Sequence, residues 1–423
     1  MASKLDLSPA ARDLLKRVKQ RYLTSRDFNG LHLRPDQTSA EEIAAAIEVV
    51  EADLVQVVGP DDYINIHIRP WPSRRAMAAQ VEELRDLSGD DYGVVLYPMA
   101  KAMKSVKLPK KYEATPFSRA MARGRSTLEV AFFSADVLEG YRNDARFRFG
   151  MSDFGINFWL TDEASDDEDH SDKDSVSLVH LGFAYDMRKY SPEDPESPIV
   201  RRVAAFYGDL KNLTPEHQQR WSSYQVDTDG IDPHPVWFAS QMGTWPDGVG
   251  PFGRLRQELE NINELFENVW GMKLFRTHEA PDDFGWILRA DQREWDHFIH
   301  SLDKLLSDNI NGSALDNAGV ERKNSAGQPI GTLVRLERFM RMNHVEPDKA
   351  TWALAPLREV RAARQKPAHS LRANVTDKTF VRKQMRLMHD VNEVLINMRQ
   401  WLASHPRNRE WSDPLSGLKN YPI

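Results

Sequence analysis

Two helical patterns separated by a proline lie between residues 348 and 403. Leu354, Leu357 and Val360 recur at the spacing of one helix face, and Pro367 lacks the N–H that a helix interior needs. A longer apolar stripe follows the proline, formed by Phe380, Leu387, Val391, Leu395, Met398 and Leu402. These patterns predict a helix at about 348–365 that breaks near Pro367, and a helix at about 377–403 that packs back on it. This part of the chain is therefore expected to fold as a bundle of helices.

Basic residues and a histidine gather at the predicted break. Arg361 and Arg364 are one turn apart and point the same way. His369 follows Pro367, so we expect it beside the helix end rather than buried along the helix. Helices on both sides would hold these groups in a rigid cleft, which favours Arg364 and His369 as a candidate catalytic pair.

The spacing by itself is not specific. The chain has 13 histidines among 423 residues, and a loose version of the same spacing recurs at Arg26 and His32 and at Arg399 and His405. The second of these pairs is the runner-up candidate, weakened because its histidine lies beyond the last predicted helix with no following element to fix it. The helical context therefore favours the pair near the proline.

The run Arg361-x-x-Arg364-Gln-Lys-Pro-Ala-His369, on a helix followed by a polar link and a long closing helix, resembles the signature of HEPN-domain ribonucleases. The resemblance covers roughly residues 252–405. Many members place Asn, Asp or His after the arginine, whereas this chain has Gln365 there. The resemblance implies a HEPN-like helical bundle over residues 251–423, a homodimer formed through it with the motifs facing each other, and a toxin, abortive-infection or antiviral (antiphage) effector.

An arginine and a histidine suffice for a metal-independent cut in RNA, because RNA carries its own nucleophile, the 2′-hydroxyl. Histidine titrates near neutral pH and can move protons in either direction. An arginine fork matches the phosphate oxygens and stabilises the charge of the transition state. The expected products are a 2′,3′-cyclic phosphate and a 5′-hydroxyl, DNA is not expected to be cut, and no cofactor or metal is needed.

Neighbouring residues are assigned supporting roles. Arg361 is a second phosphate contact or a surface charge partner, Glu359 can orient a catalytic side chain or merely pair with a cation, and the role of Gln365 stays open. Candidate RNA-binding residues on the same run are Arg358, Lys366 and Arg372.

Local charge fits a polyanionic partner better than the whole chain does. Residues 358–386 hold nine cations against two acids, a surplus of seven: Arg358, Arg361, Arg364, Lys366, Arg372, Lys378, Arg382, Lys383 and Arg386 against Glu359 and Asp377. Such a patch can grip a few phosphates, or pair with acidic residues elsewhere in the fold. The chain as a whole is acidic, with a formal net charge of −7, which argues against broad, sequence-independent binding of nucleic acid.

Composition excludes several chemistries. The absence of cysteine excludes disulfides, thiolate zinc sites and a cysteine nucleophile. No apolar run approaches the roughly 20 residues of a membrane helix, and the N-terminus lacks a signal-peptide core. A cytoplasmic location without membrane contact is therefore expected.

Residues 1–250 predict an α/β or α+β domain. Helical patterns at about 8–24, 39–51 and 73–87 alternate with strand-like segments at 54–58, 63–69 and 93–97. Later segments at 127–133, 154–160 and 176–185 also predict strands, the last two as a hairpin around the acidic loop 162–174. That loop lacks the spaced ligands and glycine of a calcium-binding hand, so no metal site is assigned to it.

An aromatic, turn-rich connector is expected at 206–250, with the domain boundary near Gly250. Beyond it, helices are predicted at about 252–270, 290–309, 331–343, 348–365 and 377–403, with 311–329 as a flexible insertion.

Two classes of function remain open. One is an endoribonuclease whose N-terminal domain binds an activator or inhibitor. The other is a non-catalytic HEPN-like protein that only dimerises or binds an acidic partner, or is one subunit of a defence complex.

Overall fold

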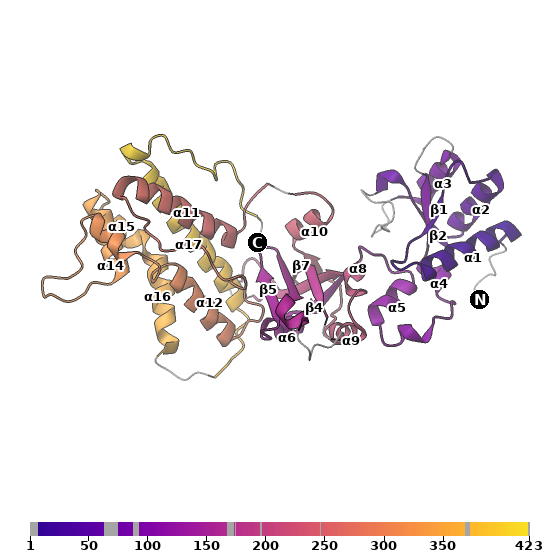
Figure 1. The fold of residues 1–423 in the computed structure, drawn as a ribbon, viewed down its shortest axis with the longest axis horizontal. Coiled ribbons are helices and arrows are strands. Elements are labelled where there is room, and N and C mark those ends of the chain that lie inside the picture. The colour runs from indigo at the N-terminus through magenta and orange to yellow at the C-terminus, as the bar shows by residue number, and fades with distance from the viewer. Residues whose placement is uncertain are drawn as a thin grey trace.

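Three regions follow one another along the molecule (Figure 1). The structure, a computed structural model, describes residues 7–62, 75–87, 93–166, 173, 175–194, 197–245, 247–368 and 373–421. A small sheet with helices comes first, a larger sheet lies in the middle, and helices form the C-terminal region.

The first region is a three-stranded antiparallel sheet covered by helices. Its strands, in the order β1-β3-β2, are β1 (Leu31–Leu33), β3 (Val94–Pro98) and β2 (Val55–Val58). The helices are α1 (Pro9–Thr24), α2 (Ala40–Glu51) and α3 (Met77–Arg85), and the short α4 (Ala100–Met103) follows β3. Alternate strand residues such as Val57 and Leu96 point into a core of their own with Leu14 and Val49.

The second region is built on a six-stranded sheet whose pairings are antiparallel. The path runs β4-β8-β7-β6-β5, with β9 paired to β7. The strands are β4 (Val130–Ser134), β5 (Phe147–Met151), β6 (Gly155–Leu160), β7 (Ser177–Asp186), β8 (Val200–Phe206) and β9 (Ile231–Pro233). Its helices are α5 (Pro116–Ala122), α6 (Glu139–Arg142), α7 (Asp162–Ser165), α8 (Tyr207–Leu210), α9 (Pro215–Ser223) and α10 (Pro235–Gln241).

The two faces of this sheet carry different cores. Phe133 and Phe158 face Trp221 of α9, with ring centroids 4.9 and 6.5 Å from it. On the other face Trp237 of α10 lies flat on Gly182, where an added Cβ would come within 2.2 Å of the indole, so only glycine fits beneath the ring.

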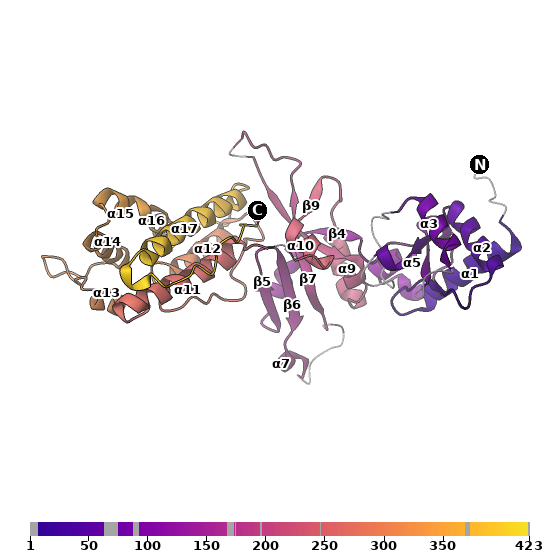
Figure 2. The same ribbon diagram turned by 90° about the horizontal axis from the view of Figure 1, so that it is seen from above.

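The C-terminal region is helical. Its described helices are α11 (Pro251–Trp270), α12 (Gln292–Leu305), α13 (Gly312–Asn317), α14 (Thr332–Met342), α15 (Pro347–Ala353), α16 (Ala355–Ala368) and α17 (Phe380–Ala403). Helix α17 packs along α11 and also contacts α16, which packs on α12 (Figure 2). Among the described residues, none of the helices is long and apolar enough to cross a membrane.

A half-buried carboxylate fastens the helices to the sheet. Asp153, in the turn between β5 and β6, accepts hydrogen bonds from the backbone N–H groups of Phe252 (2.7 Å) and Gly253 (3.0 Å) in the first turn of α11. The indole of Trp286 donates to the carbonyl of Asp153 at 2.8 Å. The helix N-terminus thus receives its negative partner from another region of the chain.

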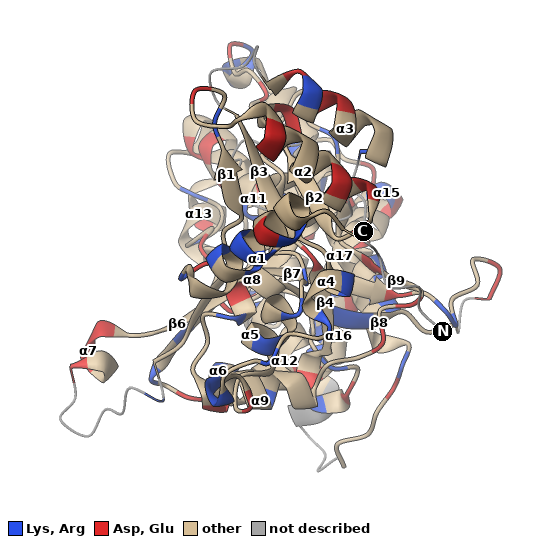
Figure 3. Ribbon diagram, turned by 90° about the vertical axis from the view of Figure 1, so that its right-hand side faces the viewer, with Lys and Arg blue, Asp and Glu red and all other residues tan. Residues whose placement is uncertain are grey.

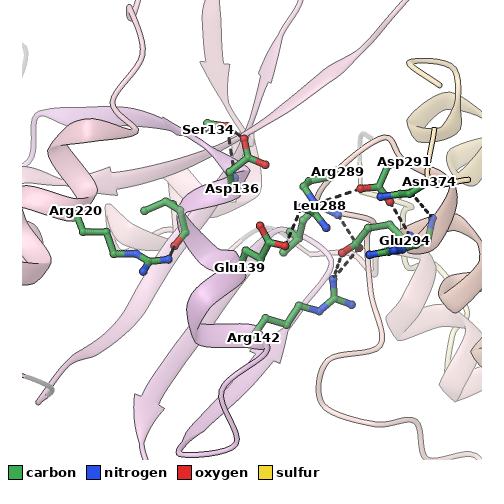
Figure 4. Close-up of polar contacts among 12 residues, drawn as sticks. Ser134, Asp136, Glu139, Arg142, Arg220, Leu288, Arg289, Asp291, Glu294 and Asn374 are labelled. Carbon is green, nitrogen blue, oxygen red and sulfur yellow. Dashed lines mark hydrogen bonds and ion pairs between the residues drawn. The ribbon is translucent and has the colours of Figure 1, made fainter. Parts of the chain in front are cut away.

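Ion pairs add to this junction. Arg142 of α6 makes two hydrogen bonds to the carboxylate of Glu294 on α12, at 2.7 and 2.8 Å, and Arg289 pairs with Glu139 at 2.9 Å (Figure 4). The sheet and the helices therefore share one polar network and one apolar core.

Several predicted elements are confirmed. The helices expected at 8–24, 39–51, 252–270, 331–343 and 377–403, and the strands at 54–58, 93–97, 154–160 and 176–185, occur within a few residues of the prediction. The coarse fold class is also confirmed, because antiparallel sheets with helices come first along the chain and a helical region follows. The strand expected at 63–69 lies outside the described residues.

Other predictions were wrong in detail. The segment 348–365 forms two helices, α15 and α16, with Leu354 buried between them, and α16 continues through Pro367 to Ala368 instead of stopping before it. Residues 311–329 are no loose insertion, because α13 buries Ala314 and Leu315 and an isolated bridge pairs Lys323 with Pro329.

Residues 206–250, interpreted as a connector, supply α8, α9, β9 and α10 to the sheet region. The acidic segment begins as α7, on the projecting β6–β7 hairpin (Figure 3). Asp162, Glu163 and Asp166 are exposed there.

Replacement of Arg399 by alanine is expected to destabilise the helical region. The carboxylate of Glu258 on α11 is fully buried and accepts from Nε of Arg399 at 2.6 Å, so the variant leaves this carboxylate with only the more distant Arg254, at 3.6 Å, as a cationic partner among the described residues. We expect a loss of about 3 kcal/mol in the free energy of unfolding, measured by urea denaturation. Arg386→Ala, on an exposed site of the same helix, is the matched control and should change stability by less than about 0.5 kcal/mol. Equal denaturation midpoints for the two variants would contradict this role for the buried pair.

Candidate active site

Helix α16 presents Arg361 and Arg364 to α12. Leu357 and Val360 of α16 are buried in the shared core, which fixes the rotation of the helix about its axis. Because residues three apart lie on the same face, the two arginines project together along the side of α16 that packs on α12. The predicted common direction of the arginines is confirmed by their shared partners.

Two aspartates receive the arginines. Nη1 of Arg361 lies 2.8 Å from Oδ2 of Asp303, and Nη1 of Arg364 lies 2.5 Å from the same oxygen. Both guanidinium groups also pair with Asp308, each with a different carboxylate oxygen. The four side chains therefore form a closed cluster of two positive and two negative charges.

Burial differs strongly across this cluster. The carboxylate of Asp303 is fully buried, and its Oδ1 has no hydrogen-bond partner among the described residues. The side chains of Arg361 and Arg364 are 38% and 26% exposed. The aspartate therefore forms the floor of the cluster, and the arginines form its solvent side.

Electrostatics keep Asp308 and the two arginines ionised. Burial raises the pKa of Asp308, but the hydrogen bonds and charges of Arg364 and Arg361 outweigh it and the pKa is lowered from its ordinary value. Hydrogen bonds to the two aspartates raise the pKa of both arginines. The fold thus holds two charged guanidinium groups in one place at neutral pH.

A histidine of α12 borders the same cluster. His300 lies one turn before Asp303 on the helix, and burial together with the positive charges of Lys304 and Arg364 lowers its pKa. A neutral imidazole at pH 7 can accept a proton, which is the state that a general base requires.

The remaining predicted site residues are distributed as follows. Arg358 turns away from the cluster, donates to the carbonyl of Thr351 at 3.0 Å and pairs with Glu337 of α14. Glu359 and Gln365 are exposed on α16. His369 and Arg372 lie outside the described residues, as does the side chain of Lys366.

Several other cations of the basic run have partners within the fold. Lys383 pairs with Asp377 at 2.9 Å and Arg386 with Asp390 at 3.5 Å, whereas Arg382 donates to the carbonyl of Asp194 at 2.6 Å. Much of the surplus counted in the sequence is therefore balanced or engaged locally.

The runner-up pair is not arranged as a site. Arg399 is buried between Glu258 and Asp413, at 2.6 and 2.5 Å. His405 packs beside Trp270, with ring centroids 5.6 Å apart, and its Nδ1 accepts from the N–H of Arg407 at 3.2 Å. Arg399 and His405 therefore each contact other residues of the fold, and the two side chains do not line a common cleft.

Sequence reasoning missed the groups that α12 contributes. His297, His300 and Asp303 recur every three residues, a spacing that predicts a polar edge beside the apolar face of an amphipathic helix. The spacing locates the polar edge of α12, but it does not show that α16 packs against this edge. Among the described residues there is no cluster of three or more His, Cys, Asp or Glu side chains with the geometry of a metal site.

No family model, curated protein or solved structure matches this chain. The chemistry of the cluster is therefore inferred from its own residues.

The ion cluster predicts an acid-sensitive contribution to stability. The pKa of Asp308 is lowered in the folded chain, so the unfolded state binds more protons than the folded state in this range. The contribution of Asp308 is present above about pH 4, the ordinary aspartate pKa, and is lost as the pH falls through its lowered value. We expect the melting temperature of the wild type to fall more steeply below pH 4 than that of Asp308→Asn, by differential scanning calorimetry. Asp296→Asn on α12 is the control and should follow the wild type; parallel curves for all three proteins would refute the assignment.

Proposed function

We propose that this chain is a metal-independent endoribonuclease whose active site lies at the C-terminal end of α16. Arg364, with Arg361 beside it, contacts the scissile phosphate, and His369 transfers protons. The observation that carries the proposal is the convergence of two partly exposed guanidinium groups at the end of the helix that leads into position 369.

The geometry leaves donors for a substrate. Within the described residues, the ion pairs of Arg361 and Arg364 run through Nη1 of each side chain. A guanidinium has five N–H donors in a planar fork, so Nη2 and Nε on the exposed side are suited to phosphate oxygens. The aspartates fix the forks in advance, which lowers the entropy lost when a phosphate binds.

The reaction needs one proton removed and one delivered. The 2′-hydroxyl loses its proton as its oxygen attacks phosphorus, the bond to the 5′-oxygen breaks, and that oxygen takes up a proton. The products are a 2′,3′-cyclic phosphate and a 5′-hydroxyl, so no water, metal or cofactor enters this step. His369 serves as one proton carrier, and the neutral imidazole of His300 is available as a second.

The architecture supports a HEPN-like bundle for the C-terminal region. Helices α11 and α17 pair along their length, α12 and α16 pair beside them, and the arginines lie near the end of α16 before the long closing helix. A homodimer through this region, a role as a toxin or antiviral effector and an activator or inhibitor bound by the N-terminal sheets belong to the same proposal.

Replacement of His369 by alanine should abolish cleavage. The variant removes a proton carrier, whose contribution is about 10²-fold or more in rate. The measurement is the cutting of mixed total RNA in excess EDTA, with analysis of the product ends. His389→Ala is the matched control, because that histidine is exposed on α17 away from the cluster. Cleavage by the wild type and the control alone, with 2′,3′-cyclic phosphate ends, supports the proposal; equal cleavage by all three proteins, or loss of activity in EDTA, counts against it.

Arg364→Lys separates catalysis from folding. Lysine keeps the positive charge opposite Asp303 but loses the planar fork, whereas alanine would also leave the buried carboxylate with one partner fewer. We expect cleavage to fall by about 10²-fold with a melting temperature within a few degrees of the wild type. Arg386→Lys, at an exposed position of α17, should retain full activity. A loss of stability with unchanged activity per folded molecule would make the cluster structural.

A second candidate is a non-catalytic binding or assembly protein. It is favoured by the charge balance of the cluster, because Asp303 and Asp308 already neutralise Arg361 and Arg364. In this case the four side chains only join α12 to α16. Wild-type protein that forms a dimer by light scattering but leaves RNA intact, alone or with cell extract as a source of activator, would favour this candidate.

A further inference from the structure

A polar cavity lies where the six-stranded sheet meets the helical region. It has a volume of about 380 Å³, within the range of small-molecule sites. The sheet side contributes residues 134–136 and 199–202, and the helical side contributes residues 288–291 together with Thr376, Lys378 and Val381. Figure 4 shows Ser134 and Asp136 on the sheet side and Arg289 and Asp291 on the helical side.

Arg201 on β8 is the unusual residue of this cavity. It is 3% exposed, and in the described part of the chain it makes no ion pair with a carboxylate. Its Nη1 donates to the carbonyl of Ile287 at 2.6 Å, and its guanidinium carbon lies 4.8 Å from the ring centre of Trp286 and 5.5 Å from that of Phe183. These contacts offset only part of the cost of burying a charge.

Buried donors remain at this end of the strand. Nε and Nη2 of Arg201 have no hydrogen-bond partner among the described residues, and the same is true of Nε of Arg202. Arg202 points to the opposite face of the sheet, because neighbouring strand residues alternate, and it has Asp186 as a partner. Buried polar groups in folded proteins are nearly always satisfied, so the two open N–H groups of Arg201 indicate an acceptor supplied from outside the chain. Burial also lowers the pKa of the Arg201 guanidinium, and the interaction with the phenol of Tyr185 acts in the opposite direction without outweighing it.

Four cations and two acids line the cavity: Arg201, Arg202, Arg289 and Lys378 with Asp136 and Asp291. Arg202 and Arg289 have carboxylate partners, at 3.3 Å to Asp186 and 2.9 Å to Glu139. Lys378 is exposed at the cavity edge. Among the described residues, the cations of the lining without a carboxylate partner are therefore Arg201 and Lys378.

The rest of the lining fits an organic ligand. Ile199, Val200, Leu288 and Val381 give the cavity apolar walls. The carboxylate of Asp136, which accepts from the hydroxyl of Ser134 at 2.7 Å, can accept hydrogen bonds from hydroxyl or amino groups of a ligand as well. A bare inorganic ion would leave this part of the cavity unused.

We propose that the cavity binds a nucleoside phosphate or a phosphorylated small molecule of that size, with the phosphate on Arg201 and Lys378 and the organic part against the apolar wall and Asp136. This site is separate from the cluster on α16 and does not depend on ribonuclease activity. Thr376 and Lys378 belong to the connection between α16 and α17, so the ligand would contact the same connection that carries position 369.

The test is calorimetric titration of the full chain with ADP, with adenosine and inorganic phosphate as its two halves. ADP should bind more tightly than either half. Arg201→Met keeps the length and apolar stem of the side chain, and should weaken ADP binding by about tenfold or more without lowering the melting temperature. Lys378→Ala, at an exposed position, should weaken ADP binding by about threefold or more and serves as the second variant if Arg201→Met fails to fold.

Arg148→Met is the matched control, because Arg148 is an exposed sheet arginine that pairs with Asp282 away from this cavity. Its affinity for ADP should equal that of the wild type. The proposal is overturned if ADP does not bind at millimolar concentration, if Lys378→Ala and a folded Arg201→Met bind ADP like the wild type, or if inorganic phosphate alone binds as tightly as ADP.

Discussion

The carboxylate of Asp153 fixes the position of the helical region on the sheet. It lies in a turn of the sheet region and accepts the first free N–H groups of α11, which have no partner within their own helix. Burial raises the pKa of Asp153, and the hydrogen bonds from α11 act in the opposite direction. From α11 the contacts run to α17, from α17 to α16, and from α16 to α12. The helix with the two arginines is therefore placed by a series of packed elements that begins at one capping residue.

The local pattern of apolar and polar residues was sufficient to predict most of the helices and strands. Alternation in β6 and the apolar stripe of α17 report one buried face each, and such periodicity depends on a few neighbouring residues. The break between α15 and α16 was missed because Leu354 continues the apolar spacing across it. Pro367 did not stop α16 before it, since a proline near the last turn removes few hydrogen bonds within the helix. The division of residues before 250 into two sheets depends on long-range pairing, which no short window encodes.

The candidate site was predicted in part, and the missing part came from another helix. The common direction of Arg361 and Arg364 follows from their spacing on α16 alone. Their partners Asp303 and Asp308 lie more than fifty residues earlier in the chain and become partners only when α12 packs on α16. A buried aspartate such as Asp303 has the same sequence signature as an exposed one, so its role cannot be identified before the helices are placed. The surplus of basic residues in this run was likewise a local property that the fold largely balances.

The arginines of this chain show two ways of accommodating a guanidinium. Arg361, Arg364 and Arg399 each have a carboxylate within 2.8 Å, so their charges are compensated by the chain itself. Arg201 is more deeply buried than Arg361 and Arg364, yet it is held by one carbonyl, by aromatic rings and by the phenol of Tyr185, and not by a carboxylate of the described residues. Burying a guanidinium without a carboxylate costs more free energy than burying it beside one. The fold provides carboxylates for its half-exposed arginines but none, among the described residues, for Arg201. Arg201 has no carboxylate partner among the described residues and lines a cavity together with the exposed Lys378, which is the pattern expected where the compensating charge arrives with a ligand.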